Sequence, residues 1–104
     1  MNKPLPDWLV VCVWRALLGE IYPSIRAIAI ALSEDKILTI RYYVDGTPTE
    51  MDRDSMEIVA TNISASISLD AIAHIELDCQ HAISPIGTLS PLDGFIYCRR
   101  EYEI

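Results

Sequence analysis

The sequence predicts one α+β domain over residues 1–104: a mainly antiparallel sheet of about four strands with two helices packed on one face. Two segments space their apolar residues with the period of a helix, and four alternate apolar and polar residues as strands do. Turn and capping residues separate these segments in the order α-β-β-α-β-β. A chain of 104 residues, 51% of them apolar, is large enough for one hydrophobic core and too apolar for disorder.

The first helix is expected over residues 7–18. Asp7 can cap its N-terminus, and Gly19 can end it in a left-handed conformation. Its apolar positions form a wide stripe of helical period: Leu9, Val10, Val13, Trp14, Leu17 and Leu18. Within this stripe we expect Trp14 to anchor the core.

A β-hairpin follows, with strands over residues 25–32 and 36–44 and a polar turn between them. The first strand carries large aliphatic side chains on one face and alanines on the other. The alanine face has room for a helix to approach closely. On the second strand, Tyr42 is expected to pack in the core or at an edge, whereas Arg41 and Tyr43 can reach solvent.

The second helix should begin at a capping box made by Thr47 and Glu50, with Pro48 in the first turn, and should end near residue 66. Its predicted buried stripe consists of Met56, Val59, Ala60, Ile63 and Ile67. Residues 69–79 alternate as an amphipathic strand, residues 80–94 form the longest irregular segment, and residues 95–104 form a last strand.

Negative charge is concentrated in the second half of the chain. Residues 1–44 carry five basic and four acidic side chains, whereas residues 45–104 carry three basic and eleven acidic ones. This balance argues against nucleic acid as a partner, because binding to phosphate backbones depends on Lys and Arg. It suits a basic protein partner, although negative charge also serves solubility alone.

Residue types that perform catalysis are scarce and scattered. His74 and His81 could form an acid–base pair, and with Asp78 and Cys79 they leave a faint trace of a metal site, but the paired spacing of zinc ligands is absent. The four glycines are isolated, and no serine lies in a nucleophile elbow. We therefore expect no enzyme activity, no metal and no cofactor.

Three cysteines, Cys12, Cys79 and Cys98, cannot all pair within one chain. This count favours buried free thiols in a reducing compartment. The longest apolar run, residues 8–14, is far shorter than the roughly 18–20 residues of a membrane-spanning helix. We expect a cytoplasmic protein with no membrane partner.

Residues 21–65 resemble the immunity proteins of bacterial contact-dependent growth inhibition systems. The segments that carry the resemblance are 25–30, 35–36, 40–43 and 45–52, whose residues are IRAIAI, DK, IRYY and DGTPTEMD. The resemblance implies a cognate toxin domain as partner, often a nuclease such as an RNase. A basic nuclease site could be covered by a layer of carboxylates in place of nucleic acid.

The expected partner-binding residues are therefore mostly acidic: Glu50, Asp52, Asp54, Glu57, Glu76, Asp78, Glu101 and Glu103, with Tyr43 and Tyr102 as aromatic contacts. Two alternatives remain open. One is a small-ligand site under residues 80–94, and the other is a homo-oligomeric structural domain that associates through an exposed strand edge.

Overall fold

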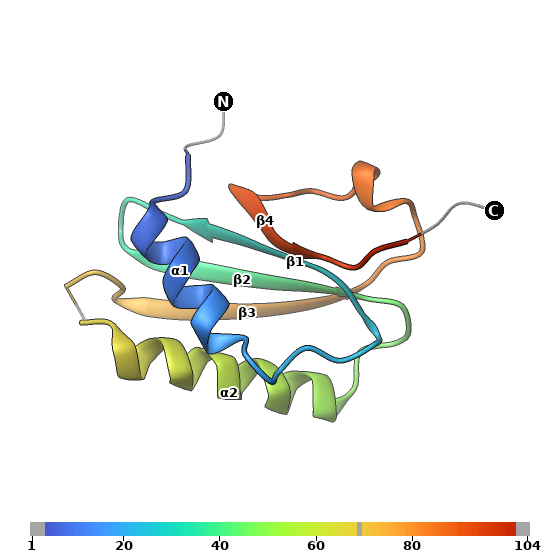
Figure 1. The fold of residues 1–104 in the computed structure, drawn as a ribbon, viewed down its shortest axis with the longest axis horizontal. Helices are drawn as coiled ribbons and strands as arrows, with labels where there is room; N and C mark the ends of the chain where they lie inside the picture. Colours follow the sequence, from blue (N-terminus) through green and yellow to red (C-terminus); the bar gives the residue numbers. More distant parts are fainter. Residues whose placement is uncertain (1–3, 69, 102–104) are drawn as a thin grey trace.

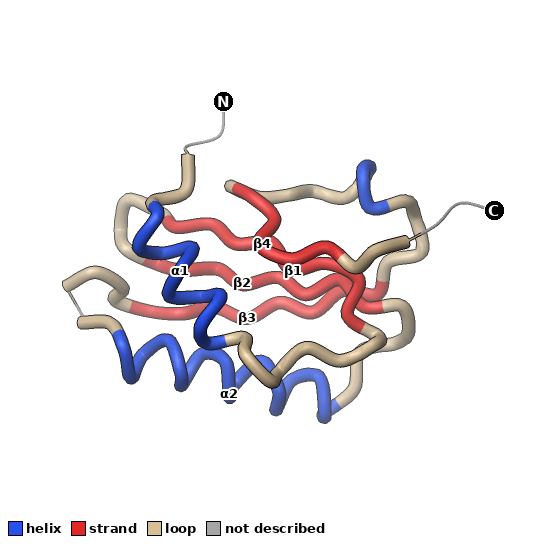
Figure 2. Tube along the Cα trace, viewed as in Figure 1, coloured by secondary structure: helices blue, strands red, loops and turns tan. Residues whose placement is uncertain are grey.

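A computed structural model describes residues 4–68 and 70–101 and shows an α+β fold with two α-helices and a four-stranded sheet. Along the chain the elements are α1 (Asp7–Ala16), β1 (Ile25–Leu32), β2 (Ile37–Val44), α2 (Glu50–Ser66), β3 (His74–His81), the 3₁₀ helix η1 (Ile86–Thr88) and β4 (Gly94–Cys98). The strands lie in the order β3-β2-β1-β4 (Figures 1 and 2). The predicted fold class, the two helices and the four strands are confirmed.

The sheet is mixed, which corrects the prediction of a mainly antiparallel one. β1 pairs antiparallel with β2 and with β4, but β2 and β3 run parallel from the pair Ile37–His74 to the pair Val44–His81. The cause lies in the connection: α2 carries the chain back along the sheet, so that β3 starts beside the start of β2. Parallel neighbours require such a crossover, and a helix is its usual form.

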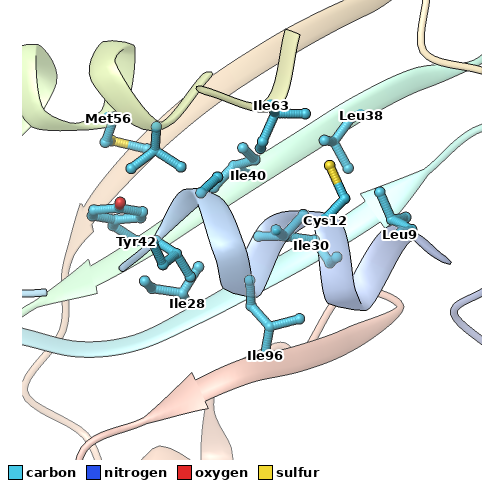
Figure 3. Close-up of a cluster of buried hydrophobic side chains, with 14 of the residues drawn as sticks. Leu9, Cys12, Ile28, Ile30, Leu38, Ile40, Tyr42, Met56, Ile63 and Ile96 are labelled. Atoms are coloured by element: carbon cyan, nitrogen blue, oxygen red, sulfur yellow. The ribbon is translucent and has the colours of Figure 1, made fainter. Parts of the chain in front are cut away.

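The main core lies between the sheet and the two helices; in Figure 1, α1 crosses in front of the strands and α2 runs along the β3 side of the sheet. Both helices and three strands contribute aliphatic side chains that are almost fully buried, as Figure 3 shows: among them are Leu9, Ile28, Ile30, Leu38, Ile40, Met56, Ile63 and Ile96. Within the stripe predicted for α2, Met56, Val59 and Ile63 are buried. The large face of β1 is thus the face that the helices cover.

The alanine face of β1 is covered by the irregular segment after β3, and the expectation of a helix there is wrong. Ala27 and Ala29 are fully buried against Leu89, Leu92 and Phe95. Alanine leaves room here for a loop that brings its own apolar side chains.

Tyr42 lies inside the main core, and its hydroxyl has no hydrogen-bond partner among the described residues. Burial raises the pKa of this hydroxyl. We expect Tyr42→Phe to raise the free energy of unfolding by about 1 kcal/mol, because it removes an unpaired buried polar group. Urea denaturation measures the change.

Tyr43→Phe is the matched control, since the Tyr43 hydroxyl donates a hydrogen bond to the Ser90 carbonyl at 2.8 Å. That variant should lose stability by a similar amount. A destabilised Tyr42→Phe protein would show that the Tyr42 hydroxyl has a stabilising partner after all.

Several predicted boundaries shift. The N-cap of α1 is Pro6, without a side-chain cap, and Asp7 lies inside the first turn. α1 ends at Ala16, and Gly19 follows with the expected positive φ of 79°. β3 starts only at His74, and β4 ends at Cys98.

Three side chains that we expected to be buried are exposed: Trp14, Leu18 and Cys98. Trp14 is 53% exposed on the outer face of α1, because the centre of the buried stripe lies at Leu9, Val13 and Ala16. The Trp14 indole Nε1 donates to the Ile96 carbonyl at 2.8 Å and so holds the ring at the margin of the core. The Cys98 thiol also lies at the surface, whereas Cys12 is buried.

Candidate functional site

The outer face of α2 carries a row of exposed carboxylates. Glu50, Asp54 and Glu57 follow one another at i, i+4 and i+7, which places them on one side of a helix. We call these three residues the α2 acidic stripe. Glu57 has a long ion pair with Arg53, at 3.8 Å between side chains that are largely exposed. Glu50 and Asp54 have no ion-pair partner within residues 4–68 and 70–101, so their charge is available to another molecule.

Two apolar side chains lie beside the α2 acidic stripe. Met51 is 74% exposed and Ile58 is 49% exposed. They are seven residues apart, which is about two helical turns, so they share one side of the helix. An apolar contact flanked by charges is the usual layout of a protein interface, in which the centre is dry and the rim is polar. Met51 and Ile58 are not among the predicted partner-binding residues, although both fall outside the buried stripe of the helix.

Asp52 caps α2 and is not part of its exposed surface. Thr49 is the N-cap, and the Asp52 carboxylate accepts from the Thr49 backbone N–H at 2.8 Å while the Asp52 N–H donates to Thr49 Oγ1 at 3.3 Å. The capping box therefore lies two residues later than predicted. Tyr22 donates its hydroxyl proton to Asp52 at 2.5 Å, a tertiary contact that favours this register.

The pKa of Asp52 reflects the same contacts. Burial works to raise it, but the hydrogen bonds from Tyr22 and Thr49 outweigh burial and lower the pKa below its usual value. Asp52 is 7% exposed. Its charge serves the start of α2, and the prediction that it faces a partner conflicts with its burial.

The carboxylates of β3 lie on the sheet face opposite the helices. Ile75, Leu77 and Cys79 pack toward the helix-side core, so alternation directs Glu76 and Asp78 the other way. Asp78 forms an ion pair with Arg41 on the neighbouring strand, with 2.6 Å between Arg41 Nε and Asp78 Oδ2. Glu76 is exposed and has no ion pair with any other described residue. The structure thus separates these two residues from the α2 acidic stripe by the thickness of the sheet.

Tyr43 is buried beneath the segment after β3. Its side chain is 3% exposed, and its ring meets Phe95 edge-on at a centroid distance of 6.4 Å. The expectation that Tyr43 reaches solvent is therefore wrong, and its contact with a partner stays a prediction. The irregular segment covers what would otherwise be an open strand position.

Glu101 belongs to an ion-pair network around the buried Arg26. The Arg26 guanidinium donates to both carboxylate oxygens of Glu101, at 2.8 and 2.7 Å, and also to the carbonyls of Ala82 and Ser84. Arg99 reaches the same carboxylate at 2.9 Å. Hydrogen bonds from Arg26, supported by Arg99, lower the pKa of Glu101 to about 2.

This network ties the end of the described chain to β1 and to the segment after β3. Arg26 is 6% exposed although it is charged. The one sign of it in the sequence is an arginine within an otherwise apolar strand. Glu101 is thus neutralised by its own chain, and Tyr102 and Glu103 lie outside the described residues.

A shallow depression of about 480 Å³ opens beside this network. Its lining includes Ile83, Pro85, Ile86 and Gly87 together with Arg26. Every donor nitrogen of Arg26 is already bonded to protein oxygens. The depression therefore offers a ligand little polar recognition from Arg26.

No group of three or more His, Cys, Asp or Glu side chains in the part of the chain that the structure describes is placed to hold a metal ion. No helix in residues 4–68 or 70–101 is both long enough and apolar enough to cross a membrane.

Comparison with known families decides the broader identity. The model of the MafI2 immunity protein family matches residues 6–101 and so spans every helix and strand. The chain belongs to this family. The predicted resemblance to an immunity protein of a toxin–immunity system is confirmed. A comparison with curated proteins found no match. Membership of the MafI2 family implies that the chain's role is to neutralise a toxin.

Proposed function

We propose that this MafI2 family member binds its cognate toxin domain in the cytoplasm through the α2 acidic stripe and blocks a basic, nuclease-type active site. The toxin would arrive from a neighbouring cell, as in the contact-dependent systems that the sequence resembles. The immunity protein itself performs no catalysis in this scheme. The observation that carries the role is the family match over residues 6–101.

The charges of α2 support the proposed surface. Glu50 and Asp54 are exposed and lack an ion-pair partner among the described residues, whereas Asp52, Asp78 and Glu101 are engaged within the chain. A nuclease attracts phosphate with a cationic cleft, and exposed carboxylates on a rigid helix are attracted to the same cleft. Met51 and Ile58 supply apolar contact area beside these charges.

Charge reversal on the stripe tests the surface. We expect Asp54→Lys/Glu57→Lys to slow association with the toxin domain about tenfold or more at low salt, and to weaken the salt dependence of the rate. Both positions are exposed, so the fold should be retained. Stopped-flow or surface-plasmon-resonance kinetics with the cognate toxin domain measures the rate.

Asp35→Lys/Asp70→Lys is the matched control, because it makes the same charge change at exposed positions away from α2. It should alter association far less. Equal rates for wild type and the α2 variant would remove the α2 acidic stripe from the interface. Failure of the wild-type protein to protect cells that produce the toxin would refute the proposed role itself.

A further inference from the structure

The outer face of α1 exposes apolar side chains that the proposed function does not use. Trp8 is 45% exposed, Val11 43%, Trp14 53% and Leu18, just after the helix, 78%. Contiguous apolar surface of this kind marks an interaction site, and tryptophan is a preferred anchor in such sites.

The exposed residues are arranged with an internal symmetry about Val11. Trp8 and Trp14 lie three residues before and after it, and Asp7 and Arg15 lie four before and after it. On a helix with 100° per residue, the members of each pair point to opposite sides of the Val11 direction by equal angles. The two ends of the pattern carry opposite charges: Asp7 at one end is acidic, and Arg15 at the other is basic.

We propose that this face of α1 is a self-association surface whose occupant is a second copy of the chain. When two α1 helices pack antiparallel around a two-fold axis at Val11, Asp7 of each copy lies opposite Arg15 of the other. By the same axis, Trp8 of each copy lies at the height of Trp14 of the other, on the opposite side of the two Val11 side chains. A two-fold interface has to be complementary to itself, and the symmetric placement of Asp7 and Arg15 about Val11 meets this requirement.

The charges favour a second copy over another partner. Asp7 and Arg15 are exposed and form no ion pair with any residue in the described ranges. They are eight residues apart, about 12 Å along the helix, too far to meet within one copy. One acid and one base give this face no net charge, so it offers a basic toxin nothing comparable to the α2 acidic stripe.

The surroundings of α1 favour a packed contact. The hydrogen bond from Trp14 to the Ile96 carbonyl holds the indole in place before association. A groove of about 570 Å³ lies on the other side of the helix, lined by Trp8, Val11 and Arg15 and by Asn62, Ser66 and Ile67. The two-fold axis places Trp8 of the second copy on this side of the contact, and the groove gives it room. A stable interface covers about 800 Å² per partner, so the groove walls would join the helix face in the contact.

Charge swaps test the pairing directly. We expect sedimentation velocity of the wild-type protein alone to show a monomer–dimer equilibrium. Asp7→Arg alone or Arg15→Asp alone places like charges opposite each other and should raise the dimer dissociation constant about tenfold. The double variant D7R/R15D should restore wild-type association, and an equimolar mixture of the two single variants should form a heterodimer.

Two further variants complete the experiment. Val11→Glu places two carboxylates at the axis and should leave a monomer, while Asp35→Arg in the β1–β2 turn should leave the dimer unchanged. Circular dichroism verifies that each variant is folded. A wild-type monomer at every concentration, or a double variant no better than the singles, would overturn the proposal. Toxin binding is not part of this measurement, so its outcome is independent of the proposed function.

Discussion

Arg26→Ala is expected to lower the free energy of unfolding by about 1–3 kcal/mol, the usual cost of leaving a buried hydrogen-bond acceptor without its donor. The change leaves the Glu101 carboxylate without its bidentate donor and removes the donor from the carbonyls of Ala82 and Ser84. Urea denaturation followed by circular dichroism measures the loss.

Arg53→Ala is the control for the loss of an arginine from an ion pair. The Arg53–Glu57 pair is long and exposed, so its removal should change stability by less than about 0.5 kcal/mol. Arg26→Lys keeps the charge without the bidentate geometry and should fall between wild type and Arg26→Ala. Equal stability of the two alanine variants would mean that the Arg26 network contributes no more than a surface pair.

Ile63→Ala is expected to cost about 2–5 kcal/mol, since the side chain is fully buried between α2 and the sheet and its truncation leaves a cavity. Thermal and urea denaturation should both report the loss. Retention of the fold can be verified by the far-ultraviolet spectrum below the transition.

Ile58→Ala is the same substitution on the same helix at a position that is 49% exposed. It should change stability by less than about 1 kcal/mol, partly because alanine favours helix. If the toxin contacts α2 as proposed, Ile58→Ala should instead weaken binding. Similar stability losses at the two positions would contradict the assignment of the buried face of α2.

The hairpin could be predicted from the sequence because its signal is local. Alternation over residues 25–32 and a polar turn determine β1, β2 and their antiparallel pairing without reference to distant residues. The parallel pairing of β3 is not local, since it depends on where α2 returns the chain. The order strand, helix, strand over β2, α2 and β3 is itself typical of a crossover between parallel strands, so it could have predicted the mixed sheet.

The candidate site was predicted only in part for a similar reason. Glu50, Asp54 and Glu57 share one helix face, which spacing alone shows. The state of Asp52 and Glu101 depends on Tyr22 and Arg26, which lie 30 and 75 residues away in sequence. The composition alone does not distinguish these carboxylates from exposed ones. In the folded chain, however, Asp52 is buried and Glu101 is neutralised by an ion pair.

The crossover has one more consequence, for the coupling between a bound partner and the edge of the sheet. Among the described strands, β3 lies at an edge and pairs with β2 alone, and its apolar side chains pack toward the core that α2 helps to build. We therefore expect a molecule that binds α2 to stabilise β3 as well, without touching it. Slower hydrogen exchange of the β3 amides on binding would report contact at α2, even where the strand itself stays in solvent.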